Sequence, residues 1–241
     1  MFNLTKGRLI LILVFLFLGR IFLSFLFNHS DAVNNYYWSK YLWENGFLGF
    51  LGKGVPNAMD AYYPPLAYYL LFLMRGFYLL IYKFFWQINL LIPAFPSNFI
   101  FWLETKEVAF AINKLPGIFS DFGSAWLIYL LVKRMGQKKL AIPASLAYLI
   151  TPAVWYNSSL WGQNDSFCYF FVLLSFWLLL KNKILFALVI FILAFFSKQI
   201  VMIALPVFLI FLWRKARWGD YIAGVLSFLM ITFILYFPFQ S

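Results

Sequence analysis

The chain has 241 residues, of which 64% are hydrophobic and only 11% are charged, and its mean hydropathy is +0.84. A water-soluble domain cannot hide that much apolar surface, so the composition excludes the soluble classes and indicates a membrane protein. The net charge of +11 does not indicate nucleic-acid binding, because the basic residues stand in short clusters between apolar runs.

The first predicted element is the apolar run from Leu9 to Phe27, which follows Lys6 and Arg8. About 20 apolar residues suffice to cross a bilayer as a helix. The run is too long for a signal peptide and has no small-residue cleavage site, so we predict a retained span. Arg20 lies inside this span, where a charge is costly unless it faces protein or reaches the membrane surface.

Residues 28–114 are predicted to form one long segment on the extracytoplasmic side. The run Pro65 to Trp86 within it resembles a span but contains Arg75 and Lys83. If it crossed the membrane, every later basic cluster would move outside, unless the short, proline-interrupted stretch 88–102 crossed back. We therefore predict that Pro65–Trp86 is a helix lying in the outer interface.

A second, shorter interfacial helix is predicted from Ala32 to Glu44. Ser30 or Asp31 would be its N-cap, since Ser and Asp side chains accept hydrogen bonds from the free N–H groups of a first turn. No repeat of fixed period and no disordered linker divides the sequence. Residues 1–241 are therefore predicted to form a single module.

Six further apolar runs follow: Leu115–Val132, Leu140–Tyr156, Phe167–Leu180, Ile184–Phe196, Val201–Trp213 and Tyr221–Phe237. Basic clusters at 133–139, 181–183 and 214–217 separate alternate runs. The positive-inside rule places these clusters and the N-terminus in the cytoplasm, which predicts seven spans. The predicted fold is therefore all-α, with about seven transmembrane helices and two interfacial helices.

Three carboxylates have both a structural and a functional interpretation. Asp31 is a helix cap or a catalytic group, and Asp60 is a turn residue before two prolines or a site residue. Asp121 falls within an apolar run, where a carboxylate is a functional candidate by default. Its structural alternative is an ion pair with Arg20.

The sequences "WGQND" and "SKQ" lie on the predicted outer side as well. Gln163 and Asp165 either solvate a loop or line a site, and Lys198 either snorkels to the headgroups or binds an anion. Together with the carboxylates above, they gather acidic groups and a cation at one membrane surface. That combination suits chemistry on an anionic lipid substrate.

Five features occur in a fixed order: an acidic residue after the first span, "DAYYPPLAYY", "LPGIFSDFGSAWLIYLL", "WGQND" and "SKQIVMIALP". Over Leu9 to Trp213 this series resembles the GT-C superfamily of polytopic glycosyltransferases. It is similar to bacterial and archaeal mannosyltransferase-like members and to the dolichyl-phosphate-glucose-dependent glucosyltransferases. The resemblance implies a seven-span module with two interfacial helices in its first external loop. Family members usually continue with further spans, so the C-terminal part of the family architecture is expected to be absent.

The resemblance also implies roles for individual residues. Asp31 would be the general base, and Lys198 and Arg75 would hold the donor phosphate. The remaining candidates are the substrate-binding residues Asp60, Tyr63, Trp161, Gln163 and Asp165, and the supporting residues Asp121 and Gln199.

The predicted activity is an inverting hexosyl transfer from a polyprenyl-phosphate donor to a lipid-linked or glycan acceptor outside a prokaryotic plasma membrane. No metal or cofactor is expected, because the chain has one histidine, one cysteine and no Gly-rich phosphate loop. Membrane lipid and a partner subunit are the other expected contacts, and nucleic acid is not. Two alternatives remain: a non-catalytic or split module that binds lipid or a partner, and a lipid or solute transporter, which would need internal pseudo-symmetry.

Overall fold

The structure is a computed structural model that describes residues 5–240, and no strand occurs within them. The prediction of an all-α membrane protein is confirmed. In chain order the helices are α1 (Lys6–Leu26), α2 (Ser30–Asn45), η1 (Phe50–Gly52), α3 (Pro65–Leu91), α4 (Ser97–Leu103), α5 (Lys106–Arg134), α6 (Ala141–Ile150), α7 (Pro152–Trp155), η2 (Tyr156–Trp161), α8 (Asp165–Leu180), α9 (Ile184–Ser197), η3 (Gln199–Ala204), α10 (Leu205–Trp213), α11 (Trp218–Tyr236) and η4 (Phe237–Phe239).

Each of the seven predicted runs is largely helical, but two of them are not α-helical throughout their interior. The run Leu140–Tyr156 breaks after α6, because Pro152 has no N–H group to continue the hydrogen-bond ladder. The run Val201–Trp213 begins in the 3₁₀ helix η3 and becomes α-helical at Leu205, next to Pro206. Helices α1, α3, α5 and α11 are each long and apolar enough to cross a membrane, and the other apolar helices are shorter.

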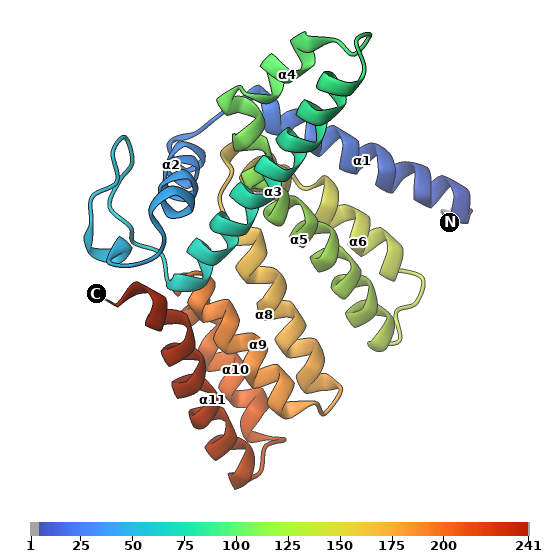
Figure 1. The fold of residues 1–241 in the computed structure, drawn as a ribbon. Coiled ribbons are helices and arrows are strands. Elements are labelled where there is room, and N and C mark those ends of the chain that lie inside the picture. The colour runs from blue at the N-terminus through green and yellow to red at the C-terminus, as the bar shows by residue number, and fades with distance from the viewer. Residues whose placement is uncertain (1–4, 241) are drawn as a thin grey trace.

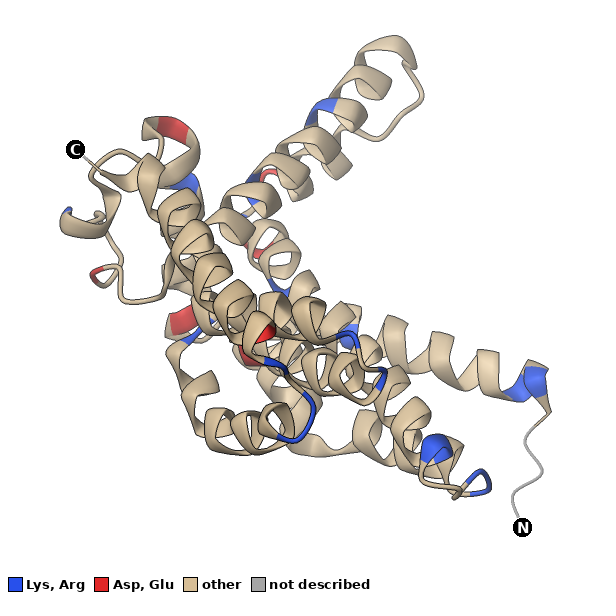
Figure 2. Cartoon of the chain, turned by 90° about the horizontal axis from the view of Figure 1, so that it is seen from below, with Lys and Arg blue, Asp and Glu red and all other residues tan. Residues whose placement is uncertain are grey.

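The helices form a bundle with one basic end. Helices α8 to α11 stand side by side in Figure 1, with α5 and α6 next to them and α1 against α5. The turns that follow α5, α8 and α10 lie at the lower end of this bundle, and α2 and α3 lie above its upper end. Figure 2, which views the chain from below, shows that the basic residues concentrate at helix ends and turns. How this bundle is oriented across the membrane stays a prediction.

Helix α3 extends beyond the predicted run and reaches Leu91. The stretch 88–102, considered above as a returning span, is instead the end of α3, a turn and the seven-residue helix α4. Seven helical residues rise only about 10 Å, too little to cross a bilayer. Because α3 itself is long enough to cross, its interfacial position stays a prediction.

A cluster of aromatic side chains fixes the segment between α2 and α3. Trp38 and Tyr68 are fully buried there and their rings meet edge to face, with Phe50 of η1 packed against Tyr68. Trp38 also donates its indole N–H to the Met59 carbonyl at 2.9 Å. The segment that leads to Tyr63 is therefore held against α2.

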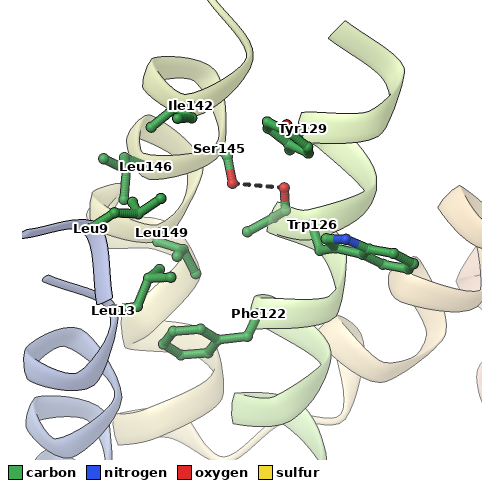
Figure 3. Close-up of a pocket in the computed structure, with 10 residues that line it drawn as sticks. Leu9, Leu13, Phe122, Trp126, Tyr129, Ile142, Ser145, Leu146 and Leu149 are labelled. Carbon is green, nitrogen blue, oxygen red and sulfur yellow. Dashed lines mark hydrogen bonds between the residues drawn. The ribbon is translucent and has the colours of Figure 1, made fainter. Parts of the chain in front are cut away.

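The groove drawn in Figure 3 has a volume of about 290 Å³ and lies between α1, α5 and α6. Leucines from α1 and α6 and the aromatic residues Phe122, Trp126 and Tyr129 from α5 line it. Ser145 donates its hydroxyl to the Ala125 carbonyl at 2.7 Å, so this polar group is already bonded. The lining suits an apolar chain and not a sugar. None of the predicted site residues lines this groove.

Candidate active site

Asp31 lies where the start of α2 meets the turn between η2 and α8. The indole Nε1 of Trp161 and the amide Nε2 of Gln163 both donate to its Oδ2 atom, each at 2.7 Å. No hydrogen bond from another residue in the range 5–240 reaches Oδ1. One carboxylate oxygen is therefore fixed and the other is open.

The predicted N-cap of α2 is wrong. The cap position is His29, which makes no capping hydrogen bond with its side chain, and Ser30 bonds to His29 Nδ1 at 3.0 Å. Because the helix begins at Ser30, Asp31 falls inside the first turn and not at the cap. Its carboxylate accepts hydrogen bonds from Trp161 and Gln163.

A π-helical turn, η2, presents Trp161 to Asp31. It follows directly on the short helix α7 and ends at Trp161, and the next residue, Gly162, has a φ of 79°. A positive φ of this kind favours glycine, because other residues meet a steric penalty there. Short π-helical turns often occur at functional sites, since the extra residue redirects the side chains that follow.

Asn157, in the same turn, joins the two halves of the "WGQND" segment. Its Nδ2 atom donates to Gln163 Oε1 at 3.2 Å and to Asp165 Oδ2 at 3.5 Å. With its oxygen bonded to Asn157, Gln163 directs its NH₂ group at Asp31. Sequence reasoning missed Asn157, because it follows directly on the run Leu140–Tyr156, which was interpreted as a span.

The predicted phosphate ligand Lys198 forms an ion pair with Asp165. Its ammonium nitrogen also lies 5.4 Å from the centre of the Tyr63 ring. Tyr63 is buried, and that burial, the hydrogen bond from Tyr62 and the charges of Asp31 and Asp165 raise the pKa of its hydroxyl. The Tyr63 hydroxyl is therefore neutral, and its ring lies beside the pair of Lys198 and Asp165.

Three other predicted site residues lie at the edge of this group or away from it. Gln199 donates to the Tyr62 carbonyl at 3.2 Å and so borders the site. Asp60 is exposed and forms no side-chain hydrogen bond among the described residues. The Arg75 guanidinium packs over the rings of Tyr36 and Tyr78 on α2 and α3, at 5.7 and 5.0 Å, and has no acidic partner within residues 5–240.

Asp121 is fully buried and forms an ion pair with Arg20 of α1, which is the structural alternative raised for it above. Ser158 of η2 donates its hydroxyl to the same Asp121 oxygen at 2.6 Å. Arg20 also donates to the Leu149 carbonyl at 2.7 Å. The pair therefore ties α1, α5 and α6 to the π-helical turn that carries Trp161.

The candidate site thus combines a carboxylate with one unbonded oxygen, a neutral hydroxyl, an ammonium group and an aromatic face. Among residues 5–240 no group of three or more His, Cys, Asp or Glu side chains is arranged to hold a metal. The arrangement can accept a proton at Asp31 and can attract an anion at Lys198.

Comparison with known proteins gave one match. The model of glycosyltransferase family 87 matches residues 118–241, just over half of the chain, and no curated protein matches. The matched part contains Trp161, Gln163, Asp165 and Lys198, whereas Asp31 lies before it. The GT-C resemblance is thereby confirmed. The chain belongs to glycosyltransferase family 87.

Proposed function

We propose that this membrane glycosyltransferase moves a hexose from a polyprenyl-phosphate donor to an acceptor hydroxyl, with inversion and with Asp31 as general base. The observation that supports the proposal most directly is the carboxylate of Asp31, whose Oδ2 is held by Trp161 and Gln163 while Oδ1 is open. A base needs an oriented lone pair within hydrogen-bond reach of the proton it removes.

In the proposed step the acceptor oxygen attacks the anomeric carbon from the side opposite the phosphate. The bond between that carbon and the phosphate oxygen breaks, and the acceptor proton passes to Asp31 Oδ1. The polyprenyl phosphate leaves with the bonding electron pair. A single displacement of this kind inverts the anomeric configuration.

The leaving phosphate needs a positive partner, and we assign this role to Lys198, whose partner Asp165 accepts from the same Asn157 amide that donates to Gln163. An ammonium group beside a developing phosphate charge lowers the energy of the transition state. The neutral hydroxyl of Tyr63 adds a hydrogen-bond donor on the same side. Trp161 offers a ring face to the sugar, and Arg75 is retained as a second candidate for the phosphate.

The acceptor is proposed to be a lipid-linked or free glycan on the extracytoplasmic side of a prokaryotic plasma membrane, with the N-terminus in the cytoplasm. The charge pattern of the loops supports this orientation. A partner subunit is a further proposed contact.

The test is a transfer assay with a panel of polyprenyl-phosphate hexoses and purified protein. Asp31→Asn keeps the shape of the side chain but not its basicity, so transfer should fall on the order of 10²–10⁴-fold while donor binding is kept. The matched control is His29→Gln, which removes the neighbouring titratable group and should remain largely active. Near-normal turnover by Asp31→Asn would move the base to another residue.

A further inference from the structure

Lys114 is a buried lysine that the proposed reaction does not use. It lies on α5 with an exposed fraction of 2%, and no carboxylate within residues 5–240 pairs with it. Its ammonium nitrogen donates to the carbonyls of Ser24 and Phe27 at 2.9 and 2.6 Å and to the Asn28 side-chain oxygen at 3.4 Å. These carbonyls are at the C-terminal end of α1, where a cation interacts favourably with the free C=O groups.

The stem of the same lysine packs against the turn that carries the donors to Asp31. A Cβ atom added at Gly162 would lie 3.0 Å from Lys114 Cε and 3.1 Å from Ala32 Cβ. Asn35 of α2 donates to the Gly162 carbonyl at 3.2 Å. Glycine is therefore needed at position 162 for two reasons, its φ of 79° and the close approach of α2 and α5.

The two contacts reach the two segments that meet at the site: the start of α2, which carries Asp31, and the turn that carries Trp161 and Gln163. The head of Lys114 fixes residues 27–28, which lead into the first turn of α2 and so into Asp31. Its stem fixes Gly162, the residue between the two hydrogen-bond donors Trp161 and Gln163. Lys114 of α5 thus contacts both the segment that leads into Asp31 and the turn that carries the two hydrogen-bond donors.

We propose that Lys114 and Gly162 are positioning residues that together set the distance between Asp31 and its two donors. This inference rests on the proposed function for its catalytic consequence, while its structural half can be measured without any substrate. Small errors in placement are costly in catalysis, because a displacement of about 1 Å can reduce the rate by about 10²-fold.

The first test compares Gly162→Ala with Gly136→Ala. Both glycines have a positive φ, 79° and 84°, but an added Cβ at Gly136 would meet nothing within 4 Å. Both variants should carry the same backbone penalty, but only Gly162→Ala adds the close contacts with Lys114 and Ala32, so its melting temperature in detergent should fall further. Only Gly162→Ala should lose kcat, by about 10- to 100-fold with donor KM nearly unchanged. Equal kcat values in the two variants would overturn the proposal.

The second test replaces the lysine and remains informative if Gly162→Ala does not fold. Lys114→Met keeps the stem and removes the three hydrogen bonds, whereas Lys114→Arg keeps a cation and should recover part of kcat. In Lys114→Met, hydrogen exchange should be at least about tenfold faster in peptides covering 27–33 and 159–165, with α11 as the unchanged internal control.

The exchange measurement separates this inference from the proposed function. If wild-type protein transfers no hexose from any polyprenyl-phosphate donor, the proposed function fails, and exchange alone decides the role of Lys114. Faster exchange in only one of the two segments, or in neither, would refute the inference. Faster exchange in both with an unchanged kcat in an active enzyme would refute the positioning role.

Discussion

The indole nitrogen of Trp161 and the carboxylate of Asp31 are 2.7 Å apart, although 130 residues separate them in the chain. This bond does more than orient the Asp31 carboxylate, because it also fixes the ring of Trp161. The His29 ring lies over that indole with 4.3 Å between the ring centres. The Asp31 carboxylate, the neighbouring histidine and the indole ring are therefore in contact with one another.

Trp161→Phe tests this bond, since phenylalanine keeps an aromatic ring but has no N–H group. Loss of one hydrogen bond to a charged group costs about 1.5–3 kcal/mol, so kcat should fall by about 10- to 100-fold. Trp218→Phe is the control, because Trp218 is 85% exposed at the start of α11. Equal rates for the two variants in the hexose-transfer assay would show that the N–H group has no catalytic role.

The ion pair between Lys198 and Asp165 makes a two-sided prediction for donor binding. Lys198→Ala removes the proposed phosphate ligand and should weaken donor affinity about tenfold or more. Asp165→Asn keeps the shape of the partner but releases the ammonium group, so donor affinity should stay the same or rise. Binding can be followed with a fluorescent polyprenyl-phosphate analogue. Equal loss of affinity in both variants would mark the pair as structural only.

The buried pair of Arg20 and Asp121 makes a prediction about stability. Removal of one partner leaves an uncompensated buried charge, which typically costs about 3–5 kcal/mol. Arg20→Met and Asp121→Leu should therefore each lower the melting temperature in detergent strongly, and the double variant should be less affected than either. Additive losses in the double variant would contradict direct pairing.

Gly123 tests the packing of α5 against α8. An added Cβ atom there would lie 2.6 Å from an atom of the Phe170 ring, whereas at Gly19 it would meet nothing within 4 Å. Gly123→Ala should therefore destabilise by about 1–3 kcal/mol through overpacking. Gly19→Ala, the control within α1, should be neutral or slightly stabilising because alanine favours the helix. Thermal unfolding of both variants in the same detergent provides the comparison.

The orientation of the bundle can be tested on intact cells in a Cys168→Ser background. Met59→Cys should react with a membrane-impermeant thiol reagent, because Met59 is 62% exposed on the predicted outer side. Lys138→Cys lies in the basic turn after α5 and should react only after the cells are opened. The reverse pattern would overturn the predicted topology.

The predicted topology and the ordered motifs put Asp31, Trp161 and Gln163 on the same side of the membrane, and the structure joins them by hydrogen bonds, while their role in a site stays a prediction. Two residues could not be found in this way. Asn157 lies in a π-helical turn, which changes the helical period and therefore the direction of its side chain. Lys114 resembles a flanking charge before an apolar run, and no pattern shows that the carbonyls of α1 lie over it.

Residue type and motif membership also do not show which side chains are buried or already hydrogen-bonded. Asp60 stands in the motif "DAYYPP", yet it is exposed while Tyr63 in the same motif is buried beside Lys198. The cap of α2 was predicted at Ser30 or Asp31 from residue type alone. Local preference cannot show that Trp161 and Gln163 already hold the Asp31 carboxylate.

The pairing of Arg20 with Asp121 also has a consequence for biosynthesis. Arg20 is made 101 residues before its partner, so the ribosome delivers α1 to the membrane long before α5 exists. During that interval the guanidinium has no carboxylate, and a charge in lipid is unfavourable. Helix α1 should therefore remain in a polar environment, such as the insertion machinery, until α5 has been synthesised and inserted. If synthesis stops before residue 121, only a small fraction of the nascent chains should have α1 stably inserted in the bilayer.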